Sequence, residues 1–315
     1  MENKDLSTIN TTVNVKRNSN PFNVHKFRRN FSNIFFKYFC LFSGTVLFIT
    51  LFSIIYFVGK TGILVFKDVP FTTFFFSTNW TPEEQHFGAA AIIIGTLVLT
   101  GVTLLIATPI SLAVAVFISE IAPNLLKRIL RQVIGLLVGI PSVVYGYFGL
   151  TILIPFIRRI TGTEMGDGIM VAALVLSLMV FPTITRISDD ALTFLPNEYR
   201  EASYALGSTR LQMIWRVLLP GAREGIITAI ILGMARAIGE TMAVVMVIGN
   251  VAQLPITLLT PTSVLTSNIV MQIMNVKADS TWSNALNMMA FLLLLISLIL
   301  IACIRFIRNK GEQTL

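Results

Sequence analysis

The sequence predicts an all-α integral membrane protein that crosses the bilayer with six helices. Of its 315 residues, 54% are hydrophobic and 13% are charged, and the mean hydropathy is +0.77. A soluble domain is usually about one quarter charged. Several apolar runs reach the roughly 20 residues that a helix needs to cross the bilayer core. These runs are continuous rather than alternating, which disfavours a transmembrane β-barrel.

The apolar runs define where the spans are expected. The first 37 residues are polar, and the first apolar run is not followed by a signal-peptide cleavage site. Residues 1–35 are therefore expected to form a cytoplasmic tail. Pro141 and the glycines after it favour a break in the third span. The six spans are predicted at about 36–59, 89–118, 133–156, 168–187, 225–250 and 285–305.

Lysine and arginine are distributed unequally between the two sides of these spans. With the N-terminus inside, the inner segments hold 18 of the 24: seven in the tail, three in the next loop, five in the long loop and three at the end. Such residues concentrate in cytoplasmic loops. Both termini are therefore expected in the cytoplasm, and topology accounts for the net charge of +8 without nucleic-acid binding. The long outer loop, 251–284, is expected to pack on the bundle or to contact an external partner.

Several kinds of site are not indicated by the sequence. Cys40 and Cys303 fall inside apolar spans, where cysteine behaves as a small hydrophobic residue. His25 and His86 have no ligand-like neighbours, so neither a metal nor a cofactor is expected. The chain contains no G-x-x-x-x-G-K-[ST] loop for ATP phosphates, no G-x-S-x-G and no H-E-x-x-H. We expect a chain that is not itself an enzyme.

The inner segment 197–220 is expected to form two short helices joined at a glycine. Pro196 and Asn197 mark the start of the first helix, and Gly207 fits the left-handed residue that ends it. Ser208 is expected to cap the second helix, and Pro220 to stop it. An apolar stripe on the first helix is predicted from Tyr199, Ala202 and Leu206, and an apolar side on the second from Leu211, Ile214, Trp215 and Leu218.

This hairpin has two interpretations when it is considered without relatives. Small residues let another surface approach closely, so an exposed hairpin with a shallow apolar face is suited to docking a soluble partner. The alternative is an amphipathic linker that lies on the lipid. The small residues in question are Ala202, Ser203 and Ala205.

The hairpin resembles the EAA loop of type I ABC importer permeases, whose pattern is E-A-A-x-x-x-G followed by I-x-L-P. Ser203 replaces the second alanine of the pattern, and Val217 occupies the isoleucine position. The resemblance implies that segment 197–220 forms coupling helices, which sit in a cleft of a separate ATPase subunit. The matching residues are Glu201, Ala202, Ser203, Gly207, Leu219 and Pro220.

The fifth span contains two charged residues, Arg236 and Glu240. At a spacing of four they are expected to share one face of a helix. A charge at the bilayer centre costs about 2.5–3.5 kcal/mol on insertion scales, so the pair is expected to face the bundle interior or a wet pathway. It could lock helix packing, line a transport path or relay protons. The planar fork of Arg236 suits a tetrahedral oxyanion, and Glu240 could hold that fork or oppose tight anion binding.

The amino-acid sequences of two spans make the resemblance more specific. They resemble phosphate importer permeases, of the PstC type rather than the PstA type. The resemblance covers about 89–305, the expected permease domain, and implies that Arg236 and Glu240 act in phosphate passage. The stretches that carry it are Gly139–Gly149, Ala205–Arg210, Ile231–Val244 and Leu265–Ile269.

This resemblance implies a set of partners in a bacterial cell membrane. They are a second permease subunit (PstA-like), two ATPase subunits (PstB-like) and an extracytoplasmic phosphate-binding protein (PstS-like). The predicted function is therefore the membrane-spanning permease subunit of an ATP-driven phosphate importer. The alternatives are an ABC permease for another oxyanion such as molybdate or sulfate, a proton-coupled secondary transporter, and a membrane sensor or scaffold that does not transport.

Overall fold

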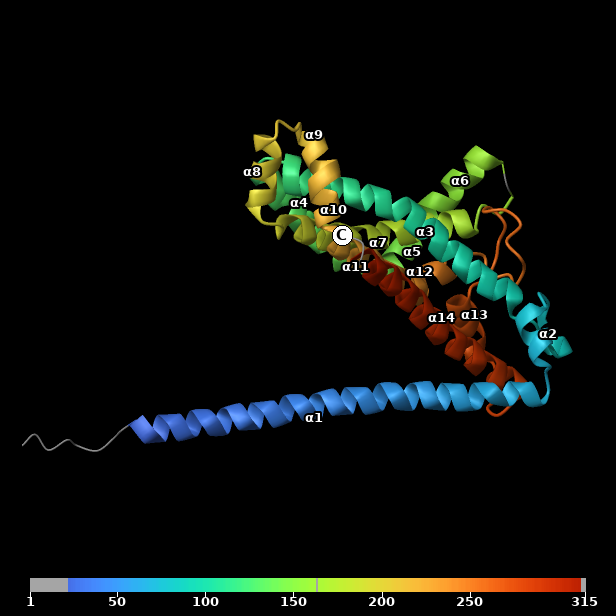
Figure 1. Ribbon diagram of the computed structural model, residues 1–315. Helices are drawn as coiled ribbons and strands as arrows, with labels where there is room; N and C mark the ends of the chain where they lie inside the picture. Colours follow the sequence, from blue (N-terminus) through green and yellow to red (C-terminus); the bar gives the residue numbers. More distant parts are fainter. Residues whose placement is uncertain (1–21, 163, 313–315) are drawn as a thin grey trace, which may run out of the picture. The chain divides into compact units, whose positions relative to one another are not determined.

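The computed structural model describes residues 22–162 and 164–312, and it is built mainly of helices (Figure 1). The chain divides into two compact units, Met1–Ile54 and Ile55–Leu315. Residues 1–21 of the predicted tail lie outside the described residues. Helix α1 runs from Phe22 to Ile63. Within the first unit, almost every side chain from Phe36 onward is exposed, and most of them are large and apolar. Such a surface fits contact with lipid.

The second unit begins with a small cap on one end of its bundle. A short hairpin pairs Trp80 with Phe87, and both side chains are buried with Phe74 against α14. Gly62 lies against the backbone of Met288 on α14. The cap elements are η1 (Leu64–Lys67), α2 (Phe71–Phe76), β1 (Trp80–Thr81), η2 (Pro82–Glu84) and β2 (His86–Phe87), and α14 is Thr281–Glu312.

The centre of the second unit is formed by α3, α7 and α11. Their facing sides carry small and apolar residues, and Gly233 brings α11 so close to α7 that an added Cβ would meet Ile184 at 2.6 Å. Small residues permit this close approach between helices in a membrane. The bounds are α3 Ala90–Val116, continued by the π-helical turn η3 Phe117–Ile121, then α7 Ile169–Thr193 and α11 Arg223–Gly239.

The third span differs from the predicted range 133–156. The chain breaks at Gly139–Pro141, as predicted, but the stretch before the break is a separate helix, α4 (Asn124–Val138), with one charged and one apolar side. The membrane-spanning candidate is Ser142–Thr161. Pro141 disfavours a helical conformation at Ile140 and thereby separates the two helices. The span consists of α5 Ser142–Phe148, the π-helical turn η4 Gly149–Leu153 and α6 Ile154–Thr161.

The fifth span also differs from the predicted continuous helix over 225–250. Helix α11 ends at Gly239, Glu240 is extended, and a short helix α12 (Met242–Val245) follows. Before α11, the segment Arg210–Gly221 meets it at a bend of 69°. Among the described residues, five helices are long and apolar enough to cross a membrane, or six if this bent pair counts as one span.

The loop 251–284 packs on the bundle, as predicted. It contains helix α13 (Leu265–Ile273), whose first four residues are buried. The amide of Leu265 donates a hydrogen bond to Thr96 Oγ1 on α3 at 3.0 Å. Gly95 lies under the same loop, because a Cβ built there would be 2.6 Å from the carbonyl oxygen of Ser263.

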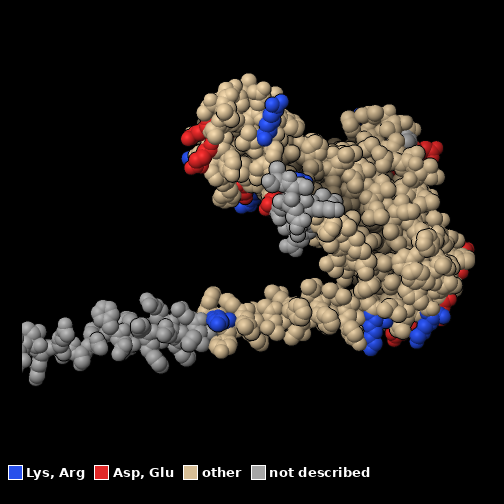
Figure 2. Space-filling model, in the orientation of Figure 1, with Lys and Arg blue, Asp and Glu red and all other residues tan. Residues whose placement is uncertain are grey.

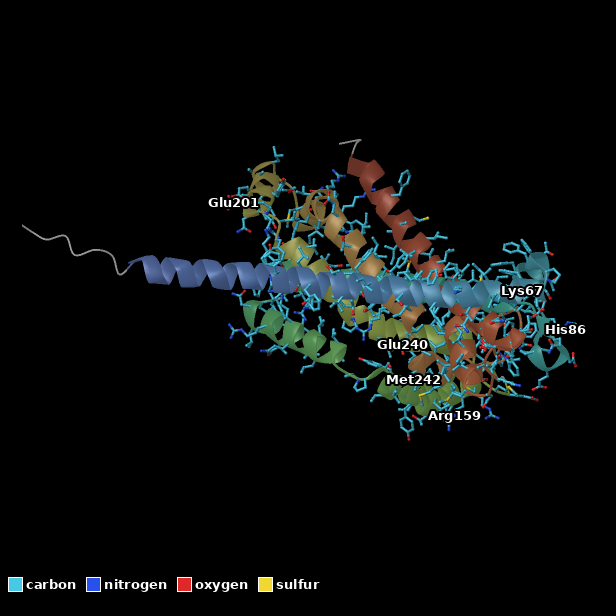
Figure 3. All side chains as sticks on the ribbon, turned by 90° about the horizontal axis from the view of Figure 1, so that it is seen from below. Lys67, His86, Arg159, Glu201, Glu240 and Met242 are labelled. Atoms are coloured by element: carbon cyan, nitrogen blue, oxygen red, sulfur yellow. The ribbon has the colours of Figure 1, made fainter. Side chains whose placement is uncertain are left out.

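Charged side chains of the second unit gather at its two ends. Figure 2 shows acidic and basic groups at the end formed by α8, α9 and α4 and at the opposite end, with an uncharged band between them on the face drawn. Figure 3 places Glu201 at the first of these ends and Lys67 and His86 at the other, with Glu240 between them. This is the distribution expected for a body that crosses a bilayer.

The contact between Gly95 and Ser263 gives the first prediction. Gly95→Ala forces the loop away from α3, so thermal stability in detergent is expected to fall by about 1–3 kcal/mol. Gly101→Ala on the same helix is the matched control, because nothing lies within 4 Å of its added Cβ. Equal melting temperatures for the two variants would contradict the packing described for 251–284.

Candidate functional site

Segment 197–220 forms a helical hairpin, as predicted. Its parts are α8 (Asn197–Ala205), α9 (Arg210–Met213), the π-helical turn η5 (Ile214–Leu218) and α10 (Leu219–Gly221). Gly207 has φ +77°, the left-handed conformation that the sequence predicts for the residue after the first helix. The amide of Gly207 donates to the carbonyl of Tyr204 at 2.9 Å.

The ends of these helices differ in detail from the prediction. Thr209, not Ser208, caps α9, in a reciprocal pair of hydrogen bonds with Gln212. Asn197 is the first residue of α8 and does not cap it. The helical turns run on to Gly221, so Pro220 does not stop them. Pro220 lies directly after the π-helical turn η5, within the three residues of α10.

An open groove of about 650 Å³ runs along the hairpin. The predicted apolar stripe of α8 lines it, with Tyr199 and Leu206 54% and 89% exposed. Of the predicted apolar side of the second helix, Ile214 and Leu218 are buried, whereas Leu211 and Trp215 are exposed. The groove is lined by Glu198, Tyr199, Ala202, Ser203, Leu206, Gly207, Ser208, Gln212, Arg216 and Val217.

The predicted coupling residues lie around this groove in different settings. Ala202 and Gly207 are exposed on its wall, and Glu201 is exposed on α8. Ser203 is buried and its hydroxyl lies 2.6 Å from that of Ser208, so the serine that replaces alanine closes the turn from within. Leu219 and Pro220 lie outside the groove, and Leu219 packs on the buried cluster beneath the hairpin.

Arg200 fixes α8 to the rest of the second unit. Its guanidinium forms an ion pair with Glu120 at the end of η3, with Nη2 2.7 Å from Oε1. It also donates to the carbonyl of Leu192 in the last turn of α7 and to that of Leu195, two residues after the helix ends, at 3.0 Å each. The side chains of Arg200 and Glu120 are 18% and 7% exposed, so water screens this contact weakly.

A second ion pair joins α4 to α7. Arg131 donates from Nε and Nη2 to the two carboxylate oxygens of Asp189, at 2.6 and 2.9 Å, and Nη2 also donates to Thr193 Oγ1. The hydrogen bonds to Asp189 raise the pKa of Arg131 above its usual value, against the opposing effect of burial. The two-pronged geometry fixes the orientation of α4 as well as its distance.

Arg236 lies in the last turn of α11 and is half-buried. Its Nη1 donates to Thr183 Oγ1 on α7 at 3.1 Å. Arg236 therefore reaches from the fifth span to α7.

Glu240 does not share a helical face with Arg236, contrary to the prediction. It follows the end of α11, and its side chain accepts a hydrogen bond from the amide of Ala243 at 3.3 Å, near the start of α12. Its carbonyl accepts from Thr266 Oγ1 on α13 at 3.1 Å. The ion pairs found in the described part of the chain are those of Arg131 and Arg200, and they do not include Arg236 with Glu240.

The sequence did not predict the partners of Arg131, Arg200 and Arg236. Glu120 and Arg200 are 80 residues apart, and Arg131 and Asp189 are 58 apart, so no local spacing links them. The charged and apolar sides of α4 indicate a helix outside the third span, and this pattern could have identified the helix that carries Arg131. Thr183 stands in an apolar run, and nothing local marks it as the contact of Arg236.

Comparison with known proteins identifies the family. The model of the binding-protein-dependent transport system inner membrane component family matches residues 107–309, which is more than half of the chain. The chain belongs to this family. The matched residues include the hairpin 197–220, Arg236 and Glu240, and they overlap most of the predicted permease domain 89–305.

Individual members of this inner membrane component family are similar over most of the chain. The probable ABC transporter permease protein YqgH of Bacillus subtilis is 42% identical over 264 residues, covering 82% of this chain and 85% of that protein. The phosphate transport system permease protein PstC of Pasteurella multocida is 33% identical and covers 87% and 92%. The protein of the same name from Xylella fastidiosa Temecula1 is 35% identical and covers 76% and 80%.

Solved structures support the type I ABC importer permease fold. A chain of the inward-facing MetNI methionine ABC transporter matches with a TM-score of 0.52 and 26% identity, covering 70% of this chain and 92% of that chain. A chain of a bacterial alginate ABC transporter matches with a TM-score of 0.62 and 15% identity, covering 90% and 96%. As a binding-protein-dependent inner membrane component, the chain is a multi-pass transport subunit whose family works with an ATPase and a substrate-binding protein.

Removing Arg200 tests the anchor of the hairpin. Arg200→Gln leaves Glu120 buried without its cation, so stability is expected to fall by about 3–5 kcal/mol. The 206–209 turn is also expected to become more sensitive to protease in vesicles. Arg210→Gln is the matched control, because Arg210 is exposed at the start of α9. Unchanged melting and proteolysis in Arg200→Gln would show that Arg200 does not anchor α8.

Proposed function

We propose that this chain is the permease subunit of an ATP-driven importer of inorganic phosphate, of the PstC type. The observation that carries the proposal is Arg236, a half-buried guanidinium within the fifth span that contacts Thr183 across the helix interface. The relatives named as phosphate transport system permease proteins support phosphate as the substrate. The chain itself hydrolyses no ATP in this proposal.

The chemistry of Arg236 suits a tetrahedral oxyanion. One hydrogen bond to Thr183 orients the guanidinium, and its other N–H groups have no partner among the described residues. A guanidinium presents planar donors to phosphate and keeps its charge in a low-dielectric site. Arg236 thus supplies an attractive contact at the depth where a phosphate ion loses most of its hydration.

Glu240 acts on the same passage from the break in the helix. Its carboxylate sits four residues after Arg236 and near the start of α12, without forming an ion pair with the arginine. A carboxylate near the path disfavours tight anion binding, because like charges repel. We assign Glu240 the role of keeping phosphate from remaining on Arg236.

The hairpin 197–220 receives the motion that drives transport. In this proposal both termini and the hairpin are cytoplasmic, and one of two PstB-like ATPases binds at the groove along α8. Glu201, Ala202 and Gly207 are exposed for that contact, and Ser203, Leu219 and Pro220 support the hairpin for coupling. A PstA-like subunit completes the membrane core, and a PstS-like protein delivers phosphate from outside. ATP-dependent closure then favours one of two states through its different contacts with each.

The substrate is tested in vesicles that carry the complete complex. ATP hydrolysis is expected to rise when the binding protein is loaded with phosphate, and radiolabelled phosphate is expected to accumulate. In the same vesicles, Arg236→Ala is expected to abolish uptake while the complex still assembles, because the anion loses its charged contact. Stimulation by molybdate or sulfate but not phosphate, or normal uptake in Arg236→Ala, would contradict the proposal.

Gly207 tests the role of the hairpin separately from that of the substrate. A left-handed conformation costs a residue with a Cβ roughly 1–2 kcal/mol, and a β-branched one is disfavoured most. Gly207→Val is therefore expected to lower substrate-stimulated ATPase activity. Gly207→Asn is the matched control and should retain coupling, since asparagine tolerates positive φ. Full coupling in Gly207→Val would remove the backbone of Gly207 from the mechanism.

A further inference from the structure

A small cavity between α4 and α7 is separate from the groove on the hairpin and from Arg236. Its volume is about 280 Å³, which is below the size of pockets that hold organic ligands, roughly 300–1,000 Å³. The size suits an inorganic ion with some of its water. The residues around it are Arg131, Ile134, Gly135, Thr185, Arg186, Asp189 and Asp190.

One side chain of this cavity has an unmet hydrogen-bonding requirement. Thr185 is 0% exposed, and its Oγ1 has no hydrogen-bond partner in the structure. Buried hydroxyls in folded proteins almost always have a partner. Thr185 is one of the residues that line the cavity, so its unused hydroxyl donor lies at the wall of the cavity, beneath the exposed surface.

The charges of the cavity leave one cation available. Arg131 and Asp189 neutralise each other in their two-pronged ion pair. Arg186 is exposed and has neither an ion pair nor a hydrogen bond among the described residues. Asp190 is the remaining charge, exposed at the rim, and it weakens the attraction of the site for anions. The cavity therefore holds one guanidinium without a partner among the described residues and one carboxylate at its rim.

The position of Arg186 links this cavity to Arg236. Thr183, which holds Arg236, Arg186 and Asp190 are spaced by three and four residues, so they lie along one side of α7. Arg186 is therefore about one helical turn, roughly 5 Å, beyond Thr183 toward the hairpin end. Along α7 in that direction, Arg186 is the first arginine after the residue that contacts Arg236.

We propose that the cavity is a second oxyanion site, at which Arg186 and the Thr185 hydroxyl bind inorganic phosphate on its way from Arg236 to the cytoplasm. The inference rests on the proposed function. Arg186 provides the charge, Thr185 donates a hydrogen bond, and Asp190 promotes release. A phosphate group on an anionic lipid has the same chemistry, and the test separates the two sources.

The test uses the complete complex in vesicles with its cytoplasmic face outward. Gly135→Cys places a thiol at the cavity, because an added Cβ there meets nothing within 4 Å. Cys40 and Cys303 are replaced by alanine, since both are exposed. The rate of labelling by a charged maleimide is measured with inorganic phosphate or with chloride at equal ionic strength, in vesicles with and without phosphatidylglycerol.

Phosphate is expected to slow the labelling in both kinds of vesicle. Arg186→Gln should raise the phosphate concentration for half protection about tenfold, the loss expected for one charged hydrogen bond. Arg186→Lys should retain most protection. Arg128→Gln is the matched control, because Arg128 is exposed on α4 outside the cavity and should leave protection unchanged.

Three results would overturn the inference. They are labelling that phosphate does not slow, protection that Arg186→Gln leaves intact, and slow labelling that depends only on phosphatidylglycerol, which would assign the site to lipid. Uptake is measured in parallel with wild-type complex. Normal phosphate uptake with unprotected labelling rejects only this second site, whereas absence of phosphate-dependent uptake in the wild type rejects the proposed function.

Discussion

The interruption of the fifth span at Glu240 is the constraint on which the other features depend. In a bilayer, backbone groups that leave a helix must find partners within the protein. Thr266 Oγ1 donates to the carbonyl of Glu240, and the carboxylate of Glu240 accepts from the amide of Ala243. The first of these contacts comes from α13, whose residues 265–268 are buried although three of them are polar. The helix ends at Gly239, and Glu240 after it is extended.

Helix α7 contacts both the hairpin 197–220 and the fifth span. Thr183 in its middle contacts Arg236, Asp189 contacts Arg131 of α4, and the carbonyls of Leu192 and Leu195 accept hydrogen bonds from Arg200 of α8. Arg200 therefore joins α8 to the end of α7 by hydrogen bonds in addition to the connecting chain. Arg236 in the fifth span and the hairpin 197–220 thus both contact α7. In the function proposed above, an ATPase bound at the hairpin acts on Arg236 through this helix.

The sequence predicted the features that depend on neighbouring residues and did not predict the contacts between distant segments. The hairpin, its left-handed glycine and the break near Pro141 follow from glycine, proline and apolar spacing within a few residues, and the structure confirms them. The range 133–156 was wrong because the apolar side of α4 extends the hydrophobic run, although its charged side marks a separate helix. The helix end at Gly239 was missed because apolar residues continue beyond it. Arg200–Glu120 and Arg131–Asp189 depend on the folded arrangement of distant segments, which no local pattern encodes.

The central claim is that Arg236 binds the transported anion directly. It is tested most directly by measuring the affinity of radiolabelled phosphate for the membrane complex, arrested with an ATPase variant that binds but does not hydrolyse ATP. The account predicts that Arg236→Ala weakens this affinity by about tenfold or more, the loss of a charged hydrogen bond in a buried site. Affinity equal to that of the wild type, in a complex that has assembled normally, would contradict it.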